Sequence, residues 1–508
     1  MTVIEVYRPG DGASLGSVPT GTPADVAEAV RTVRRVQPGW GSLEPADRAR
    51  RLADLQEALR SRSEEAADVI VSETGKPRVE ALAEVLVCLE TIRHYRKAAP
   101  RILRPRRPST GWMLWKSARV LREPHGVVGV ISPWNYPLIL AMDPTVTALF
   151  AGNGVVLKPS EYTPYTGLFL EDLCRGAGLP EGLVSVVTGD GSTGAALVGA
   201  AVDKIHFTGS TATGRRVMAG AAESLTPVTL ELGGKDPAIV LEDADLERAA
   251  RGIVFGAFYN AGQACVSTER VFVVETVYEP FLRRAVQLVG ELRAGVAGER
   301  DVGPMCHPGQ LAVVDDHLRD AVDRGARVLA GGGRDREGGR VVLPTILVDV
   351  ERGMKVLEEE TFGPILPVVK VRDEREAIDR ANEGSFGLFA SVWTRRRARG
   401  VRVARSLRAG GVSINDTLSH YALPSLPMGG VGQSGFGRTR GEAGLLEMTR
   451  TRSIFEDRMG LRREPWWYPY SGFSLRLHRT LVEWRGGSGW DGMVRTLRAL
   501  LGRTEDHR

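Results

Sequence analysis

The sequence predicts an α/β fold in which a parallel sheet flanked by helices is followed by a second α/β unit. From Val127 to about Leu232, short β-branched runs alternate with helical patterns, as in parallel sheets. A similar alternation continues from about Gly233 to about Gly430. The chain has 508 residues, of which 43% are hydrophobic and 25% charged, so it is long enough to bury large cores.

Three amphipathic helices are expected before the first sheet, over residues 24–38, 46–70 and 77–99, because apolar and charged residues recur there at helical spacing. An Arg- and Pro-rich stretch, residues 101–112, is expected to be extended. The predicted strands are, in chain order, VVGVI, VVLK, VSVVT, KIHFT, VTLEL, PAIVL, RVFVV, RVLAGG, VLPTILVDV, PILPVVKV and ASVWT.

Composition narrows the class of protein. The net charge of +5 and the pI of about 9.1 are too mild to indicate a nucleic-acid partner. The N-terminus shows no secretory pattern, and the longest apolar region is interrupted too often to form a membrane span. We therefore expect a reduced cytoplasmic protein with neither a disulfide framework nor a metal site. Its four cysteines are Cys88, Cys174, Cys265 and Cys306.

Polar residues follow several strands of the first predicted sheet, where parallel sheets bind ligands. Lys158 and Glu161 follow VVLK and could hydrogen-bond a ribose. In FTGSTATG, a strand leads through Ser210 into a helix, whose N-terminus is an anion site. This segment lacks the G-x-G-x-x-G fingerprint, so it is a weak dinucleotide signal by itself.

Three residues are candidates for catalysis, although each has an ordinary structural interpretation when taken alone. Cys265, in NAGQACVSTER, could be a buried thiol, but Asn260 and Gln263 are unusual neighbours for a core position. Glu231, before two glycines in LELGGK, could be a loop carboxylate or a general base. Asn135, in the stiff loop SPWNYP, could be a turn residue or an oxyanion donor.

Taken together in this order, the segments SPWNYP, LKPSE, FTGSTATG, LELGGK, NAGQACVS, EETFGP and GGVGQSGFGR resemble the aldehyde dehydrogenase superfamily over roughly residues 15–455. The resemblance implies that Cys265 attacks the aldehyde carbon to form a thiohemiacetal. The Asn135 side chain and the Cys265 backbone N–H would hold its oxyanion. Glu231 would then activate the water that releases the acid from a thioester.

The resemblance also implies NAD as cofactor, with NADP possible. The Glu161 carboxylate near the ribose should repel a 2′-phosphate, which favours NAD. The cofactor-binding residues implied by the resemblance are Ile131, Pro133, Trp134, Lys158, Glu161, Gly191, Gly209, Ser210, Gly214, Glu360 and Phe362.

The architecture implied by the resemblance has a Rossmann-type cofactor domain, an α/β catalytic domain and a small β arm for oligomerisation. Homodimers or homotetramers are expected. The corresponding ranges are 1–111 with 125–232 for the cofactor domain, 233–430 for the catalytic domain, and 112–124 with 431–460 for the arm and the C-terminal closure.

The substrate is expected to be a neutral aldehyde, aromatic or aliphatic. The chain is similar to bacterial succinate-semialdehyde-type members, which makes succinate semialdehyde the alternative. Those enzymes place an Arg at two substrate-pocket positions that are here Asp143 and Tyr259. Each lost charged hydrogen bond should weaken carboxylate binding by about 1.5–3 kcal/mol.

Two further alternatives concern the reaction itself. A relative that passes the thioester to coenzyme A usually lacks the carboxylate seen here as Glu231. A structural or binding relative without enzymatic activity commonly lacks the nucleophile seen here as Cys265. Both residues are present, so the sequence favours the hydrolytic dehydrogenase.

The segment from 461 to 508 extends past the usual end of the family and is basic and rich in Trp. It holds nine Arg and five acidic residues, and so carries +4 of the net +5. It could contact a membrane surface, or it could pack across a neighbouring subunit. We favour the subunit contact because the basic excess is small. The residues that suggest either role are Trp466, Trp467, Tyr468, Tyr470, Arg476, Arg479, Trp484, Arg485, Trp490, Arg495 and Arg498.

Overall fold

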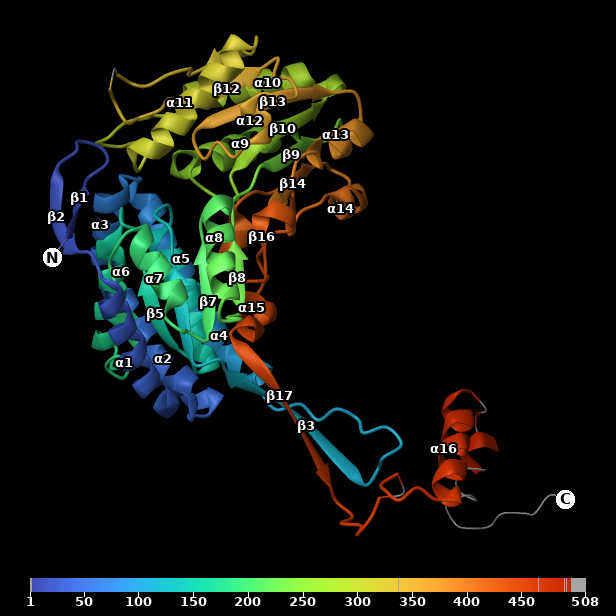
Figure 1. The fold of residues 1–508 in the computed structure, drawn as a ribbon. Coiled ribbons are helices and arrows are strands. Elements are labelled where there is room, and N and C mark those ends of the chain that lie inside the picture. Colours follow the sequence, from blue (N-terminus) through green and yellow to red (C-terminus); the bar gives the residue numbers. More distant parts are fainter. Residues whose placement is uncertain (1, 337, 465, 488, 490, 495–508) are drawn as a thin grey trace. The chain divides into compact units, whose positions relative to one another are not determined.

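The computed structural model describes residues 2–336, 338–464, 466–487, 489 and 491–494. Its contacts divide the chain into two compact units. The first comprises 1–105 and 121–452, and the second comprises 106–120 with the residues from 453 onward. The first unit contains two large sheets, drawn in Figure 1 with their covering helices.

The first sheet has six strands in the order β16-β8-β7-β4-β5-β6. All neighbours are parallel except β16, which runs antiparallel to β8 and brings the chain back from the second sheet. The strands are β4 (Val127–Ile131), β5 (Gly154–Lys158), β6 (Val184–Val186), β7 (Lys204–Thr208), β8 (Val228–Glu231) and β16 (Gly435–Phe436).

Helices between these strands make the crossovers, and an N-terminal group of helices packs with them. Helix α5 is buried along its whole length, which makes it a fixed support for the loop that precedes it. The helices are α1 (Pro23–Gly41), α2 (Pro45–Ser61), α3 (Ser63–Thr74), α4 (Arg78–Ile102), α5 (Pro137–Ala151), α6 (Pro164–Gly176), α7 (Gly191–Gly199), α8 (Thr211–Ala222) and α15 (Gly441–Glu447).

The second sheet has seven strands in the order β11-β12-β13-β10-β9-β14-β15, parallel except for β11. Its strands are β9 (Asp236–Val240), β10 (Thr268–Val274), β11 (Arg327–Ala330), β12 (Thr345–Val348), β13 (Ile365–Val371), β14 (Phe389–Trp393) and β15 (Gly411–Ile414). Its helices are α9 (Leu246–Phe258), α10 (Glu275–Gly290), α11 (Pro308–Asp323), α12 (Lys355–Glu358), α13 (Glu374–Ala381) and α14 (Arg397–Ser406).

Capping residues set the ends of the N-terminal helices. Thr22 and Asp25 form a capping box at the start of α1, and Pro23 occupies its first turn. The helix expected over 46–70 is two helices, α2 and α3, which meet at Arg62. Helix α3 ends at Gly75, whose φ of +73° is left-handed.

Some elements differ from the sequence prediction. The hairpin of β1 (Val3–Tyr7) and β2 (Ser14–Pro19) was not predicted, and neither was β15. The stretch 101–112 is not wholly extended, because α4 continues into it as far as Ile102. Arg106 then forms an isolated bridge with Val120.

The chain also forms a two-stranded sheet from β3 (Lys116–Pro124) and β17 (Thr449–Asp457), which overlaps the ranges predicted for the arm. In the second unit, Trp112, Trp115 and Trp466 pack with ring centroids 5.6–6.2 Å apart. Helix α16 (Gly472–Arg485) follows. Trp490, Arg495 and Arg498 of the predicted basic segment lie outside the described residues.

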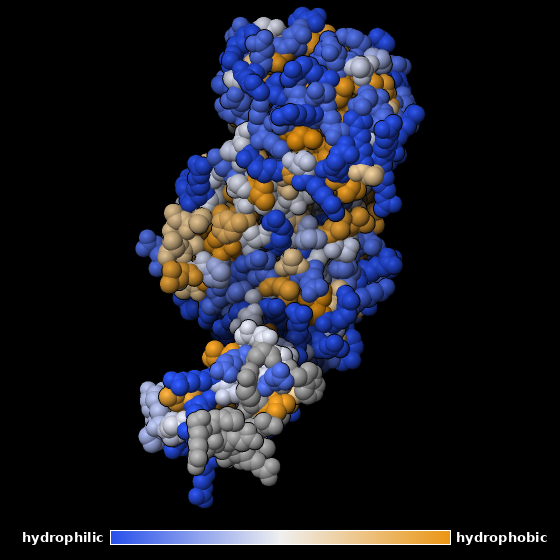
Figure 2. Space-filling model, turned by 90° about the vertical axis from the view of Figure 1, so that its right-hand side faces the viewer, coloured by the Kyte–Doolittle hydropathy of each residue, from blue (hydrophilic) through white to orange (hydrophobic). Residues whose placement is uncertain are grey.

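The face drawn in Figure 2 is mostly hydrophilic, with hydrophobic residues in separate patches. Within the described ranges, none of the helices combines the length and the apolar character needed to cross a bilayer.

Candidate active site

A strained turn presents Cys265 between the short 3-10 helix η1 (Tyr259–Gly262) and β10. Asn260, Ala261 and Gly262 all have left-handed φ values, of 55°, 55° and 71°. Gly262 also has no room for a side chain, because a Cβ there would lie 2.3 Å from the Gly363 carbonyl oxygen. A run of left-handed residues costs free energy, so the surrounding contacts must hold this turn in place.

The side chains that looked unusual for a core position supply those contacts. The Gln263 carbonyl accepts hydrogen bonds from Asn260 Nδ2 at 3.1 Å and from Asn135 Nδ2 at 2.9 Å. The Gln263 side chain donates to the Asn260 carbonyl and accepts from the Cys306 backbone N–H, both at 2.9 Å. The network fixes the Cys265 loop and brings Asn135 to it.

A buried ion pair supports Asn135 from the other side. Lys76 Nζ lies 2.5 Å from Glu84 Oε1 and donates to the Asn135 carbonyl at 2.8 Å. The other Glu84 oxygen accepts from the Leu138 and Ile139 backbone N–H groups at the start of α5. A carboxylate is favourable at a helix N-terminus, so this pair both stabilises α5 and orients the Asn135 loop.

Sequence reasoning missed this ion pair, yet it left a signal. Glu80 and Glu84 are spaced four residues apart on the face of α4 that carries Ala81, Val85 and other buried apolar residues. Acidic residues on the core side of an amphipathic helix need partners. Glu80 accepts from the Asn260 backbone N–H at 3.1 Å, so it too supports the turn before Cys265.

Glu231 ends β8 and is buried, with 7% of its surface exposed. Burial raises the pKa of its carboxyl to about 7, although Arg438, a hydrogen bond from Thr439 and Arg440 act in the opposite direction. The Thr439 hydroxyl donates to Glu231 Oε1 at 3.4 Å. A carboxyl that titrates near neutral pH is suited to accept a proton there.

The surroundings of Cys265 favour the neutral thiol over the thiolate. Burial raises its pKa above the ordinary value, and the carboxylates of Glu231, Asp236 and Glu360 add to the rise. The thiol must therefore lose its proton to a base when it attacks.

Two cavities of about 210 and 200 Å³ share Cys265 and Leu140 in their walls. We call the first the polar cavity and the second the aromatic cavity. The polar cavity is lined by Asn135 and Glu231 as well, so all three predicted catalytic residues face it. Its other walls are Pro133, Trp134, Thr208, Gly209, Ser210, Leu232, Gly233, Gln310, Val313, Glu360 and Phe362.

Most predicted cofactor residues lie on or near the polar cavity. Pro133, Trp134, Gly209, Ser210, Glu360 and Phe362 line it. The others are outside its walls. Lys158 ends β5 and lies 3.3 Å from the Glu161 carboxylate, Ile131 ends β4, Gly191 begins α7, and Gly214 packs on Leu232 within α8.

The loop that carries Glu360 and Phe362 is fastened by a second buried ion pair. Lys235 Nζ lies 2.5 Å from Glu269, whose oxygens accept from the Thr361 and Phe362 backbone N–H groups at 2.8 and 2.9 Å. Glu360 itself accepts from the Gly234 N–H at 2.8 Å. Burial, with the nearby Glu269 carboxylate, raises the pKa of Glu360 to about 8.

Gly233 and Gly234 are required by this close packing. A Cβ at Gly233 would lie 2.3 Å from a Glu360 oxygen, and one at Gly234 would lie 2.7 Å from the Cys265 carbonyl oxygen. The two glycines after Glu231 therefore allow the Glu360 loop and the Cys265 loop to approach the end of β8.

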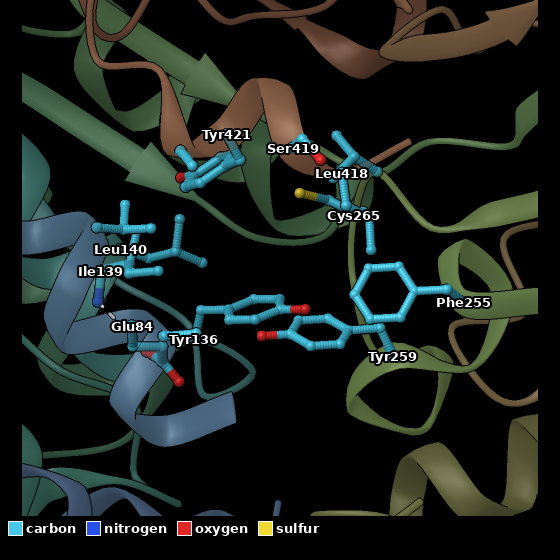
Figure 3. A pocket seen from close by; sticks show the side chains of 14 residues that line it. Glu84, Tyr136, Ile139, Leu140, Phe255, Tyr259, Cys265, Leu418, Ser419 and Tyr421 are labelled. Carbon is cyan, nitrogen blue, oxygen red and sulfur yellow. Dashed lines mark hydrogen bonds between the residues drawn. The ribbon is translucent and has the colours of Figure 1, made fainter. Parts of the chain in front are cut away.

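The aromatic cavity has a different character, shown in Figure 3. The rings of Tyr136 and Tyr259 lie nearly parallel, with centroids 6.4 Å apart, on the opposite side of the cavity from Tyr421. The Cys265 sulfur points into the cavity, on the side nearer Tyr421. The remaining walls are Ala83, Glu84, Val87, Ile139, Leu140, Phe255, Val266, Leu418, Ser419 and Ala422.

The two predicted substrate residues have different positions. Tyr259 lines the aromatic cavity. Asp143 does not; its carboxylate is buried and accepts from Arg440 Nε at 2.7 Å. The Arg440 guanidinium in turn lies 3.9 Å from the centroid of the Tyr421 ring. Asp143 therefore contributes to the pocket through Arg440 and Tyr421, not by facing the substrate.

Comparison with known proteins gives one family. The model described as "Aldehyde dehydrogenase family" matches residues 1–454. A Methylomonas protein named 4,4'-diapolycopene aldehyde oxidase is 44% identical over 93% of this chain and 89% of its own. A Mycobacterium tuberculosis protein provisionally named succinate-semialdehyde dehydrogenase [NADP(+)] 2 is 37% identical over 89% of this chain and 88% of its own.

Solved structures agree with this result. The NAD+ complex of an aldehyde dehydrogenase from Bacillus cereus is 36% identical, with a TM-score of 0.85, over 90% of this chain and 93% of that one. The α/β architecture described above is therefore shared with solved dehydrogenases.

Proposed function

This chain belongs to the aldehyde dehydrogenase family of NAD(P)-dependent oxidoreductases, and we propose that it oxidises neutral, apolar aldehydes to carboxylic acids at Cys265. The observation that supports this proposal best is the position of Cys265. It lies in the wall of both cavities, so a substrate in the aromatic cavity meets a nucleophile that also faces the polar cavity.

In the first step, the Cys265 sulfur forms a bond to the aldehyde carbon and the thiol gives up its proton. Glu231 faces the polar cavity with Cys265, and its pKa of about 7 makes it a suitable acceptor for that proton. The carbonyl oxygen gains negative charge, which the Asn135 amide stabilises by donating a hydrogen bond. One N–H of this amide donates to the Gln263 carbonyl at 2.9 Å, which leaves the second N–H to donate to the oxyanion.

The residues that line the polar cavity and those next to it suit a dinucleotide, which would also extend beyond the cavity. Its walls include the end of β7, Gly209 and the N-cap residue Ser210, which leads into the twelve-residue helix α8. Backbone N–H groups at such a helix start bind phosphate, and the Lys158–Glu161 pair would meet the ribose. When bound, NAD(P)+ would supply the acceptor for the hydride that the substrate carbon loses as the thiohemiacetal oxyanion becomes a thioester.

Before the last step, the Glu231 carboxyl releases to solvent the proton that it took from the thiol. As a carboxylate it then takes a proton from water, which attacks the thioester carbon. The carbon–sulfur bond then breaks, releasing the carboxylic acid and the Cys265 thiolate. The thioester carbon is attached to Cys265, which lines the same cavity as Glu231, so a water in this cavity can meet both the carboxylate and that carbon.

The aromatic cavity supports a substrate without charge. Of the described residues that line it, none is Lys, Arg or His, and its acidic member, Glu84, is paired with Lys76. A semialdehyde carboxylate would lose its hydration there without gaining a cation. This disfavours succinate semialdehyde, the aldehyde in the name of the mycobacterial relative.

The experiment is to follow the absorbance of the reduced cofactor with butanal, benzaldehyde and succinate semialdehyde, using NAD and NADP in turn. We expect turnover without coenzyme A, higher kcat/KM for the neutral aldehydes, and a preference for NAD due to Glu161. Cys265→Ala should abolish all turnover, with Cys306→Ala as the matched control. A preference for succinate semialdehyde would contradict the proposed substrate, and turnover by Cys265→Ala would contradict the nucleophile.

Assembly as a homodimer or homotetramer, a cytoplasmic location, and the contact made by residues 461–508 stay predictions.

A further inference from the structure

We propose that the substrate carries a long apolar chain that leaves the aromatic cavity past Ala83 and Phe255 and lies in a surface groove beside it. This inference rests on the proposed function, since it concerns the same aldehyde. The groove lies between the start of α4, helix α9 and the end of α10, and has a volume of about 650 Å³. It shares Ala83, Phe255 and Tyr259 with the aromatic cavity.

Size is the first argument. The aromatic cavity, at about 200 Å³, is smaller than the roughly 300–1,000 Å³ of most small-molecule sites. An aldehyde that fills it must be short, or must extend beyond it. Ala83 and Phe255 lie at the border between the cavity and the groove. Ala83 has a small side chain, and Phe255 is 51% exposed. An apolar chain of the aldehyde could therefore leave the aromatic cavity between these two residues.

The second argument is a continuous apolar row on α4. Val79 lines the groove, Ala83 lines both spaces, and Val87 lines the cavity. Spaced four residues apart, they lie on one face of the helix and extend for about 12 Å. Val79 is 72% exposed. An exposed apolar row that leads directly into a catalytic cavity is suited to an apolar ligand.

The third argument concerns the charges at the groove. Arg251 pairs with Glu247 at 2.5 Å, and Asp301 pairs with Arg293 at 3.0 Å. Three further charged residues line the groove: Glu80 accepts from the Asn260 N–H, Glu291 accepts from Gln287 Nε2 at 3.2 Å, and Arg300 donates to the Gly75 carbonyl at 3.1 Å. Among the described residues, only Glu80 Oε2 and Arg300 Nε of this set are buried without a partner. The floor is formed by buried apolar side chains, among them Val254, Phe258, Leu288 and Val302. The groove therefore offers an apolar chain a surface where it can leave water.

The test compares kcat/KM for butanal, octanal and dodecanal with the full-length enzyme. Each methylene that is fully buried contributes up to about fourfold, so kcat/KM should continue to rise from octanal to dodecanal. Equal values for octanal and dodecanal would overturn the inference while leaving the proposed function intact. An enzyme that reduces its cofactor with none of the three would instead overturn the proposed function.

A variant at Val79 tests whether the preference for the longer aldehyde arises in the groove. Val79→Asp places a carboxylate in the groove, and Val322→Asp, at a 46% exposed position on α11, is the matched control. The ratio of kcat/KM for dodecanal over butanal should fall by about tenfold in Val79→Asp and stay at the parent value in Val322→Asp. An unchanged ratio in Val79→Asp would overturn the inference. The inference would also be overturned if Val79→Asp formed a smaller assembly than the parent enzyme on size-exclusion chromatography. That result would assign the groove to contact with a second copy of the chain.

Discussion

The two cavities that meet at Cys265 are nearly equal in volume but opposite in chemistry. The polar cavity has Asn135, Glu231 and Glu360 in its walls, whereas the aromatic cavity has Tyr136, Tyr259 and Tyr421 among mostly apolar residues. The polar cavity holds an amide and carboxyls that titrate, whereas the aromatic cavity offers a substrate mainly rings and aliphatic side chains, with hydroxyls as its polar groups. The reaction and the substrate preference thus depend on separate sets of residues and can be altered separately.

The largest expected effect is on stability, and it concerns the buried Asp143–Arg440 ion pair that lies against Tyr421 of the aromatic cavity. Asp143→Asn should destabilise the protein by about 3–5 kcal/mol, because it leaves the Arg440 guanidinium buried without its anion. Thermal or urea unfolding measures this change. The double variant Asp143→Leu with Arg440→Met should recover much of the loss. If Asp143→Asn has the same free energy of unfolding as the parent chain, the Asp143–Arg440 pair does not stabilise the side of the aromatic cavity that Tyr421 forms.

A second variant tests the polar side alone. Asn135→Ala should lower kcat by about 10²–10³, since it removes a donor to the developing oxyanion. The ranking of butanal, benzaldehyde and succinate semialdehyde should not change, because Asn135 does not line the aromatic cavity. Steady-state kinetics with the three aldehydes checks both expectations. A changed ranking would show that the two cavities do not act separately.

The converse variant tests the aromatic side. Tyr259→Arg should raise the ratio of kcat/KM for succinate semialdehyde over butanal by about tenfold, the lower end expected for one charged hydrogen bond. We expect the lower end because Glu80, whose Oε2 has no partner, competes for the guanidinium. Tyr259→Met is the uncharged control. If both variants give the same ratio, charge in this cavity does not select the substrate.

The smallest effect is a shift in pH dependence. Glu231 acts as a base only when ionised, so activity should fall as the pH drops through its pKa of about 7. Arg438 lowers this pKa, so Arg438→Met should raise it and move the acid limb of kcat about one unit to higher pH. Arg438→Lys, which keeps the charge, should behave like the parent. An acid limb that does not move in Arg438→Met would argue against Glu231 as its source.

The polar cavity could be predicted largely from the sequence, and the aromatic cavity could not. Glu231 and Ser210 follow predicted strands of one parallel sheet, and the ends of such strands meet at one edge. Phe255, Leu418 and Val87 come from elements that no local pattern brings together. The Lys76–Glu84 pair was also missed, because its carboxylate partners the start of α5, more than fifty residues further along the chain. Asp143 was assigned to the pocket by resemblance, but Arg440 holds its carboxylate away from the lining.

The most direct test of the central claim is the time course of reduced cofactor after rapid mixing of Glu231→Gln with butanal and NAD. The account assigns to Glu231 the activation of water at the thioester. We therefore expect reduced cofactor to accumulate to about one equivalent per Cys265 and then to stop, while the parent enzyme continues. This single turnover should be slower than in the parent enzyme, because solvent must take the thiol proton that Glu231 would otherwise accept. Continued turnover of Glu231→Gln at the parent rate would contradict the account.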